Sequence, residues 1–219
     1  MHIILRNGLK FHLRNAPGDL TVFLGIYGNH VYDGFKSITK SAPVIVDIGG
    51  HVGMFSLYAA QFFPHGRIYV YEPDPQNYNF LQENVSLNKM QNIISYNVAV
   101  SGQSGEATLH VNPGNSSENN MFKVKRGMHS LSVPAVTLEH VFTSNNISSI
   151  DFLKIDCEGS EYDILLRTPH DFLTRVERMA IEWHGYAGYK PRDLTRFLEA
   201  VGFTTTFLMR PRMIYARRS

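Results

Sequence analysis

Ionisable side chains alternate with a spacing of two residues at two places in the second half of the chain. Lys154, Asp156 and Glu158 form the first set, and Glu182 and His184 form the second. This spacing places side chains on one side of a β-strand and of the segment that follows it. Titratable groups that converge on one cleft are typical of catalytic sites. We expect Asp156, Glu158 and His184 to take part in chemistry, and Lys154 to form a structural ion pair with Asp156 or Glu182.

A second candidate site is the glycine-rich stretch from Asp47 to Gly53, which follows an apolar run. Glycines at such a place let a strand turn tightly into a helix and let a ligand approach the backbone. The pattern is neither GxGxxG nor a P-loop, which weakens a dinucleotide or a triphosphate interpretation. The carboxylate of Asp47 would suit a ligand that carries an ammonium group. A plain glycine turn with Asp47 as its cap is the alternative.

Glu72 lies 19 residues after Gly53, at the end of the next apolar run. This is about where an acidic residue reaches the ribose hydroxyls in nucleoside-binding sheets. A carboxylate can accept hydrogen bonds from two hydroxyls at once. A solvent-facing charge at a strand end is the alternative, but the glycine turn one strand earlier favours the ribose contact.

Strands and helices alternate from residue 43 onward. Asp74 and Pro75 are typical of the N-cap and first residue of a helix. We expect strands at 44–48, 67–71, 93–98, 106–111, 150–155 and 178–183, helices at 53–63, from 74 onward, at 160–169 and 191–201, and two strands around Arg210-Pro211. This alternation predicts a doubly wound α/β fold with a mostly parallel sheet and helices on both faces. Ligands would then bind at the carboxyl ends of the strands.

Residues 1–42 precede this pattern and are predicted to form a small N-terminal extension to the domain at 43–219. The segment HIILRNGLKFHLRN is typical of a β-hairpin, with Asn7-Gly8 supplying the two positive-φ residues of a type I′ turn. Residues 112–131 are polar and turn-rich, which predicts a surface loop. Long loops in compact domains are often lids or binding loops, so we expect this loop and the extension to form the rim on the substrate side of the site. A disordered insertion is the alternative.

The bulk composition is that of an ordinary globular protein, with 43% hydrophobic and 18% charged residues in a chain of 219. A formal net charge of +2 implies no long-range attraction to nucleic acid or to an anionic membrane. Cys157 is the lone cysteine, so neither an internal disulfide nor a cysteine-built metal site is expected. No signal peptide and no membrane-spanning run are recognisable, which makes the cytoplasm the default location.

Five blocks resemble, in their order, the conserved motifs of the FkbM family of class I methyltransferases, over residues 43–203. Positions 50 and 51 are Gly and His where that family often has Ala and Asn. The blocks are VIVDIGGHVGMFSLYAA, YEPDPQNYNFLQENVSLN, NVAVSGQSGEATLHV, FLKIDCEGSEYDILL and IEWH. The resemblance implies a Rossmann-like sheet that binds S-adenosylmethionine. The cofactor-binding residues it implies are Asp47, Gly49, Gly50, Gly53, Glu72 and Pro73, with Val98, Ala99 and Val100 beside the adenine and Asp156 facing the methyl group.

The resemblance further implies an O-methyltransferase that acts on a hydroxyl of a small molecule, a sugar or a natural product. We expect His184 to act as general base, because the pKa of histidine lies near working pH, with Asp156, Glu158 and Glu182 orienting it or the acceptor. In this interpretation the site holds no metal. The alternative is a divalent metal ion bound by the three carboxylates.

Three other functions compete with this interpretation. A nicotinamide-dependent oxidoreductase on a similar sheet is weakened by the glycine pattern. A nucleic-acid-binding or nucleic-acid-methylating protein is weakened by the near-neutral charge. A catalytically silent scaffold would bind the cofactor without turnover. The identity of the acceptor and the oligomeric state do not follow from the sequence.

Overall fold

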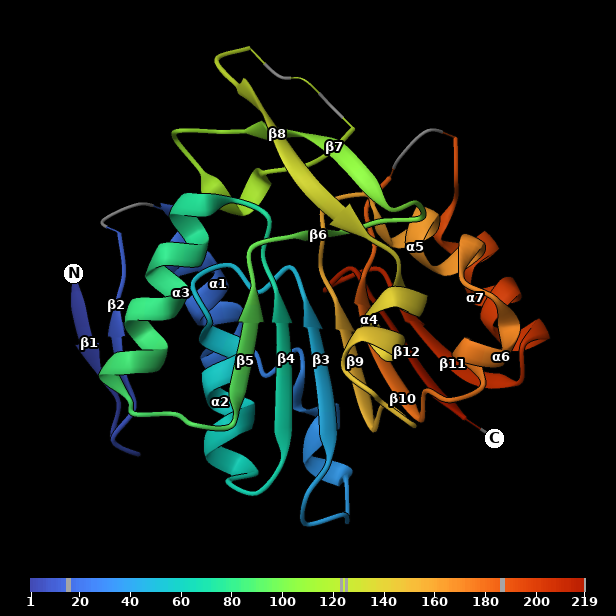
Figure 1. Cartoon of the computed structure of the whole chain (residues 1–219), viewed down its shortest axis with the longest axis horizontal. Coiled ribbons are helices and arrows are strands. Elements are labelled where there is room, and N and C mark those ends of the chain that lie inside the picture. Colours follow the sequence, from blue (N-terminus) through green and yellow to red (C-terminus); the bar gives the residue numbers. More distant parts are fainter. Residues whose placement is uncertain (15–16, 123, 125, 186–187, 219) are drawn as a thin grey trace.

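The computed structural model of the chain describes residues 1–14, 17–122, 124, 126–185 and 188–218. A seven-stranded sheet forms its centre, with the spatial order β11-β12-β10-β9-β3-β4-β5 (Figure 1). The pairs from β10 to β5 are parallel, and β12 is antiparallel to both of its neighbours. The strands are β3 (Val44–Ile48), β4 (Arg67–Tyr71), β5 (Ile93–Tyr96), β9 (Phe152–Ile155), β10 (Arg178–Glu182), β11 (Phe203–Leu208) and β12 (Met213–Arg218).

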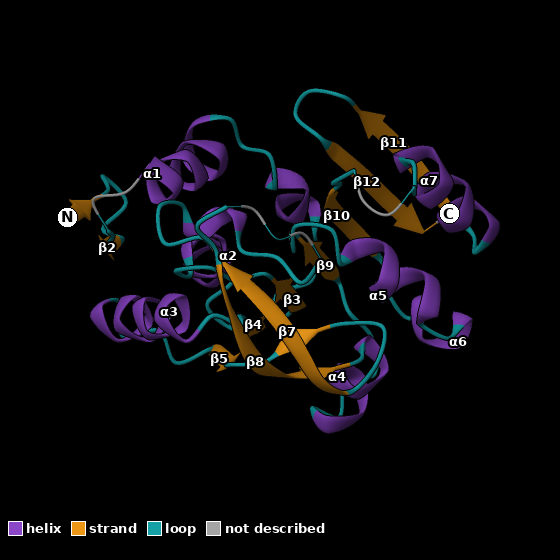
Figure 2. Ribbon diagram, turned by 90° about the horizontal axis from the view of Figure 1, so that it is seen from above, coloured by secondary structure: helices purple, strands orange, loops and turns teal. Residues whose placement is uncertain are grey.

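Helices cover both faces of this sheet, which confirms the predicted doubly wound α/β fold (Figures 1 and 2). One face carries α1 (Pro17–Phe23), α2 (Met54–Phe62) and α3 (Pro75–Leu87), and the other carries α4 (Leu138–Ser144), α5 (Glu161–Arg167), α6 (His170–Leu173) and α7 (Pro191–Ala200). Each face has its own cluster of buried apolar side chains. Asp74 caps α3 as predicted, because its side chain accepts a hydrogen bond from the backbone N–H of Gln76 at 2.8 Å.

Helices α4 and α6 are not among the predicted elements, and the third predicted strand is shorter in the structure. Residues 93–98 were predicted as one strand, but β5 ends at Tyr96 and the chain turns into β6 (Ala99–Val100). A local signal for α4 was present. Thr137 accepts a hydrogen bond from the N–H of His140 as the N-cap, and the buried residues of α4 recur at helical spacing: Leu138, Val141 and Phe142.

A small three-stranded sheet, in the order β6-β8-β7, lies over the carboxyl ends of the central strands (Figure 1). Its other strands are β7 (Gly105–Val111) and β8 (His129–Val136), and the short 3-10 helix η3 (Ser116–Glu118) lies between them. The predicted loop 112–131 is therefore partly ordered structure, and two of its residues, 123 and 125, lie outside the described residues. We refer to residues 112–122 as the cap loop.

The N-terminal hairpin forms as predicted from β1 (His2–Ile4) and β2 (Lys10–His12), but its turn type differs. Leu5 and Leu9 still pair through a backbone hydrogen bond of 2.8 Å, which leaves three residues in the loop. Only Gly8 has a positive φ, +89°, and Asn7 does not. The prediction of a type I′ turn was therefore wrong, because the loop has three residues and needs one left-handed residue at its end.

The N-terminal extension shares its core with the domain. Leu9, Phe11 and Phe35 are buried in the same cluster as residues of α2 and β9. The ring of Phe35 is fully buried and packs edge-on against Phe55, at 5.6 Å between ring centroids, and against Phe152, at 6.1 Å. The connecting segment between hairpin and domain is therefore anchored by aromatic packing.

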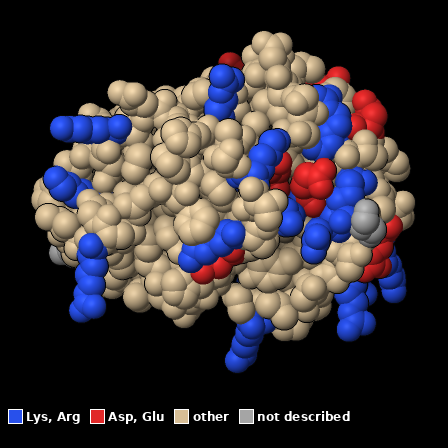
Figure 3. Space-filling model, turned by 90° about the horizontal axis from the view of Figure 1, so that it is seen from below, with Lys and Arg blue, Asp and Glu red and all other residues tan. Residues whose placement is uncertain are grey.

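Charged side chains are spread over the face that carries the amino ends of the parallel strands. Figure 3 shows lysine and arginine side chains distributed over this face, with acidic side chains beside several of them. Among the described residues, no helix has the length and apolar character needed to cross a bilayer.

Phe35→Ala should lower the free energy of unfolding by about 3–5 kcal/mol, because it leaves a cavity among buried rings. Urea denaturation followed by circular dichroism would measure the loss. Phe62→Ala is the matched control, since Phe62 packs on the same ring but is 47% exposed. Equal losses in the two variants would show that Phe35 does not anchor the extension.

Candidate active site

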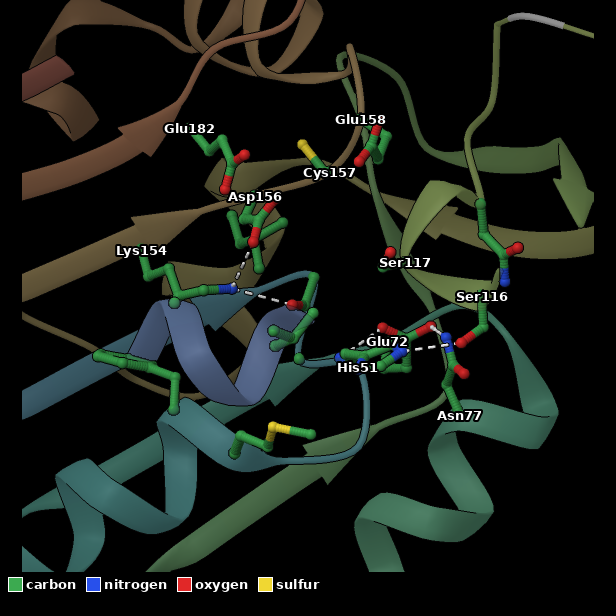
Figure 4. Close-up of a pocket in the computed structure, with 18 of the residues that line it drawn as sticks. His51, Glu72, Asn77, Ser116, Ser117, Lys154, Asp156, Cys157, Glu158 and Glu182 are labelled. Carbon is green, nitrogen blue, oxygen red and sulfur yellow. Dashed lines mark hydrogen bonds and ion pairs between the residues drawn. The ribbon is translucent and has the colours of Figure 1, made fainter. Parts of the chain in front are cut away.

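A cavity of about 600 Å³ opens at the carboxyl ends of β3, β4, β9 and β10. Residues of α1 and of the following π-helix η1 (Leu24–Gly28) complete its wall. Ser116 and Ser117 of the cap loop also line it (Figure 4). The predicted site residues that line it are Gly49, Gly50, Glu72, Pro73, Ala99, Val100, Asp156, Glu158 and Glu182. The predicted site residues outside its lining are Asp47, Gly53, Val98 and His184.

The glycine turn presents bare backbone to the cavity. Gly49 has a φ of +80°, and a Cβ added to it would lie 1.8 Å from the backbone oxygen of Asp156. A Cβ on Gly50 would lie 2.3 Å from the side chain of Val70. Neither position can hold a side chain without displacing its neighbours. Gly53 contributes differently, because its φ of +86° turns the chain into α2 without bringing it to the cavity.

Asp47 is fully buried, and neighbouring side chains bind both of its carboxylate oxygens. Oδ1 accepts from Nζ of Lys154 at 2.9 Å, and Oδ2 accepts from Oγ of Ser56 at 2.5 Å. The register of β3 and β9 pairs Asp47 with Lys154 directly. Lys154 also donates to the carbonyl of Gly49 at 2.9 Å. Lys154 and Ser56 thus occupy the carboxylate of Asp47, which does not line the cavity, so the structure does not support the expected direct contact with a ligand ammonium.

Glu72 is buried at the end of β4 and lines the cavity. Its Oε2 accepts from the N–H of His51 at 2.8 Å, and its Oε1 accepts from the N–H of Asp74 at 3.0 Å and from the Asn77 amide at 3.2 Å. Burial raises the pKa of Glu72 to about 7. A carboxylate offers about four acceptor positions. Oε2 therefore keeps capacity for a further donor, such as a ligand hydroxyl.

His51 connects the glycine turn to the N-terminal extension and to the cap loop. Its Nε2 lies 3.1 Å from the guanidinium of Arg14 and 2.9 Å from Oγ of Ser116. Arg14 in turn forms an ion pair with the fully buried Asp19 at 2.9 Å. Burial lowers the pKa of His51 to about 4, so the ring is neutral, and Nε2 accepts from the guanidinium of Arg14, which can only donate. In the sequence His51 stands out only as a departure from the family pattern. Its contacts were not predictable, because its partners come from distant segments.

Asp156 and Glu182 lie at the ends of neighbouring strands and share one partner, Tyr32. The Tyr32 hydroxyl lies 2.9 Å from Oδ2 of Asp156 and 3.2 Å from Oε2 of Glu182. One hydroxyl proton can serve only one of these oxygens at a time. Repulsion from Asp156, together with burial, raises the pKa of Glu182 to about 7. The pair therefore retains a proton up to neutral pH. Tyr32 is not among the predicted site residues and lies outside the five blocks that resemble the family.

His184 lies beside the carboxylates but does not line the cavity. Its Nε2 is 3.5 Å from Glu158, and its Nδ1 is 3.3 Å from the fully buried Glu161. Burial acts to lower the pKa of His184, but the contact with Glu161 and the charge of Glu158 raise it to about 9. The imidazole is then protonated at neutral pH. These surroundings favour a charge-balancing role for His184 over the expected role as general base.

A divalent metal is the alternative occupant of the acidic cluster. Ligand atoms of Asp156, Glu182 and His184 lie within 4.8 Å of one another, whereas the expected set contained Glu158 in place of His184. Tyr32 already contacts both carboxylates of this set. The raised pKa of His184 opposes metal binding, because an imidazole must be unprotonated to bind a metal.

The cavity wall between β4 and the small sheet β6-β8-β7 is formed by apolar side chains. Ala99 and Val100 line the cavity beside Pro73. The Asn97 side chain holds this wall by donating to the carbonyls of Glu72 and Pro73 at 2.8 and 3.0 Å. Val98 instead packs against the apolar cluster that includes α4 and α5. Tyr186, an aromatic candidate for a pocket wall, lies outside the described residues.

Comparisons with known proteins give one consistent result. Residues 47–205 match the family model of the methyltransferase FkbM domain. The chain is 26% identical to methyltransferase sdnD of Sordaria araneosa, over 84% of this chain and 82% of the relative. It is 23% identical to the 31-O-demethyl-FK506 methyltransferase FkbM of Streptomyces tacrolimicus, over 91% and 87% of the two chains.

A solved structure has a similar fold. The methyltransferase FkbM from Methylobacillus flagellatus KT superposes with a TM-score of 0.54 at 16% identity, over 84% of this chain and 46% of that one. The chain thus spans under half of that protein, and the likeness concerns the fold alone. The family match, by contrast, covers most of the chain, from the glycine turn through Glu72, Asp156 and Glu182. The protein belongs to the FkbM family of methyltransferases.

Proposed function

We propose that the protein transfers a methyl group from S-adenosylmethionine to a hydroxyl oxygen of a small molecule. The observation that carries this proposal is that one cavity joins a glycine turn and the buried Glu72 to the carboxylate pair of Asp156 and Glu182. Family membership gives the reaction class. The relative from Streptomyces tacrolimicus is named for methylation at an oxygen, which supports an oxygen acceptor.

One half of the cavity fits this cofactor. Gly49 and Gly50 line this half of the cavity with backbone alone, and Oε2 of Glu72 has an acceptor position for a ribose hydroxyl. Oδ1 of Asn77 is buried without a hydrogen-bond partner and can accept from a ligand donor. Ala99 and the other apolar residues beside Pro73 suit the faces of an adenine ring. When bound, the cofactor supplies a methyl group on a positively charged sulfur.

The other half of the cavity can remove the acceptor's proton. Glu182 lines it, and a pKa near 7 matches a base to neutral conditions. Asp156 raises the basicity of Glu182 by repulsion, and the buried hydroxyl of Tyr32 orients both carboxylates. In this assignment Glu182 is the proton acceptor, Asp156 and Tyr32 position it, and His184 balances the charge of Glu158.

Glu72→Ala should weaken binding of S-adenosylhomocysteine by about 1–3 kcal/mol, because buried hydroxyls would lose their acceptor. Isothermal titration calorimetry measures the change. Glu83→Ala is the control on the exposed side of α3, where the side chain is 57% exposed, and it should leave the affinity unchanged. Tight binding of NAD by the wild type, with no response to S-adenosylhomocysteine, would contradict the cofactor assignment.

Glu182→Gln should lower kcat by about 10²–10⁴-fold with little change in cofactor affinity, since it removes the proton acceptor. The assay follows labelled methyl transfer to any hydroxylated acceptor that the wild type methylates. His184→Gln should cost less. A larger loss in His184→Gln would return the role of base to His184. Loss of activity in EDTA, restored by magnesium or manganese, would identify the metal alternative instead.

Tyr32→Phe should move the acidic limb of the pH–rate profile upward from about 7. The hydrogen bond from Tyr32 favours the charged form of Glu182, so its removal raises the pKa of that carboxyl. Tyr27→Phe is the matched control, because the Tyr27 hydroxyl donates to the carbonyl of Met54 at 3.1 Å and not to a carboxylate. A limb that stays in place or moves to lower pH would exclude this role for Tyr32.

A further inference from the structure

The part of the cavity wall that the N-terminal extension supplies is mainly apolar, with Thr21 and Asn29 as its polar residues. Val22, Leu24 and Ile26 line the cavity from the N-terminal extension, and Val31 and Met213 line it beside them. Strand register pairs Met213 with Glu182, and Val31 directly precedes the tyrosine that contacts both carboxylates. The apolar wall therefore adjoins the end of the cavity where the acceptor hydroxyl has to lie.

Leu24 marks the outer edge of this wall. It lines the cavity and is nevertheless 52% exposed. The deeper residues Ile26 and Met213 are buried. A ligand that entered here would cover the exposed part of Leu24 and remove apolar surface from water, which stabilises the complex.

Among the described residues that line it, the cavity offers no free cation for an anionic acceptor. Lys154 is the only lysine or arginine among the described lining residues, and its ammonium is bonded to Asp47 and to the carbonyl of Gly49. His51 lines the cavity with a neutral ring. The carboxylates that line it are Glu72, Glu118, Asp156, Glu158 and Glu182. A phosphate or carboxylate brought here would lose its hydration, gain no counter-charge and face repulsion.

We infer that the acceptor is an uncharged alcohol with a mainly apolar body, and not a phosphorylated sugar, a nucleotide or a carboxylic acid. This inference rests on the proposed function, because it takes the carboxylate pair as the reacting end. The apolar body lies against the wall built by Val22, Leu24, Ile26, Val31 and Met213, and the hydroxyl points toward Glu182.

The test uses the full chain saturated with S-adenosylhomocysteine and the neutral fluorescent probe N-phenyl-1-naphthylamine. Leu24→Lys should weaken probe binding by about five- to tenfold, the effect of losing one partly buried leucine contact. Leu20→Lys is the matched control, because Leu20 lies one turn earlier, is 46% exposed and does not line the cavity. Farnesol, a neutral apolar alcohol, should displace the probe, whereas glucose 6-phosphate should not.

Three results would overturn the inference: no saturable probe binding by the wild type, equal loss in the two lysine variants, or displacement by glucose 6-phosphate at lower concentration than farnesol. Calorimetry with S-adenosylhomocysteine on the same samples separates these failures from that of the proposed function. Intact cofactor-product binding without probe binding would overturn the acceptor class alone. Absence of cofactor-product binding would overturn the proposed function and this inference together.

Discussion

The buried ion pair of Lys154 and Asp47 is the interaction on which the rest of the site depends. The ammonium of Lys154 also donates to the carbonyl of Gly49 and lies 3.8 Å from the carboxylate of Asp156. One charge therefore joins the glycine turn to the end of β9, and it lies 5.3 Å from the ring centre of Tyr32. Removal of either partner would leave an uncompensated buried charge, which commonly costs about 3–5 kcal/mol. Two neighbouring strand ends are thereby held in the spacing that a ligand across them requires.

Acidic side chains outnumber cations among the described residues around the cavity, and the pKa values of several of these acids are raised. The pKa values of Glu72 and Glu158 are raised to about 7 chiefly by burial, and that of Glu182 chiefly by repulsion from Asp156. A positively charged ligand would favour the ionised forms and release protons as it binds. The carboxyl groups would thus gain negative charge as a sulfonium cofactor binds at its proposed place.

The sequence predicted well those features that depend on local pattern, such as β3, the glycine turn and the cap of α3. Glu72 was placed correctly on the cavity because a parallel sheet brings all carboxyl strand ends to one edge. Contacts between distant segments were not predictable in this way. Tyr32 reaches Asp156 over 124 positions and Glu182 over 150, and the pKa of His184 depends on Glu161, whose burial no spacing reveals. The ion pair of Asp47 was not predictable for the same reason, because only the strand register places Lys154 beside its carboxylate.

The N-terminal extension contributes adjacent residues to two different properties of the enzyme. Val31 belongs to the apolar wall, and Tyr32 hydrogen-bonds to the carboxylate pair. An exchange of this segment between relatives would transfer acceptor preference and pH preference as one unit. On these assignments a substitution at Leu24, on the exposed edge of the wall, would alter acceptor preference alone, whereas a change in the segment that ends at Tyr32 would alter both properties together.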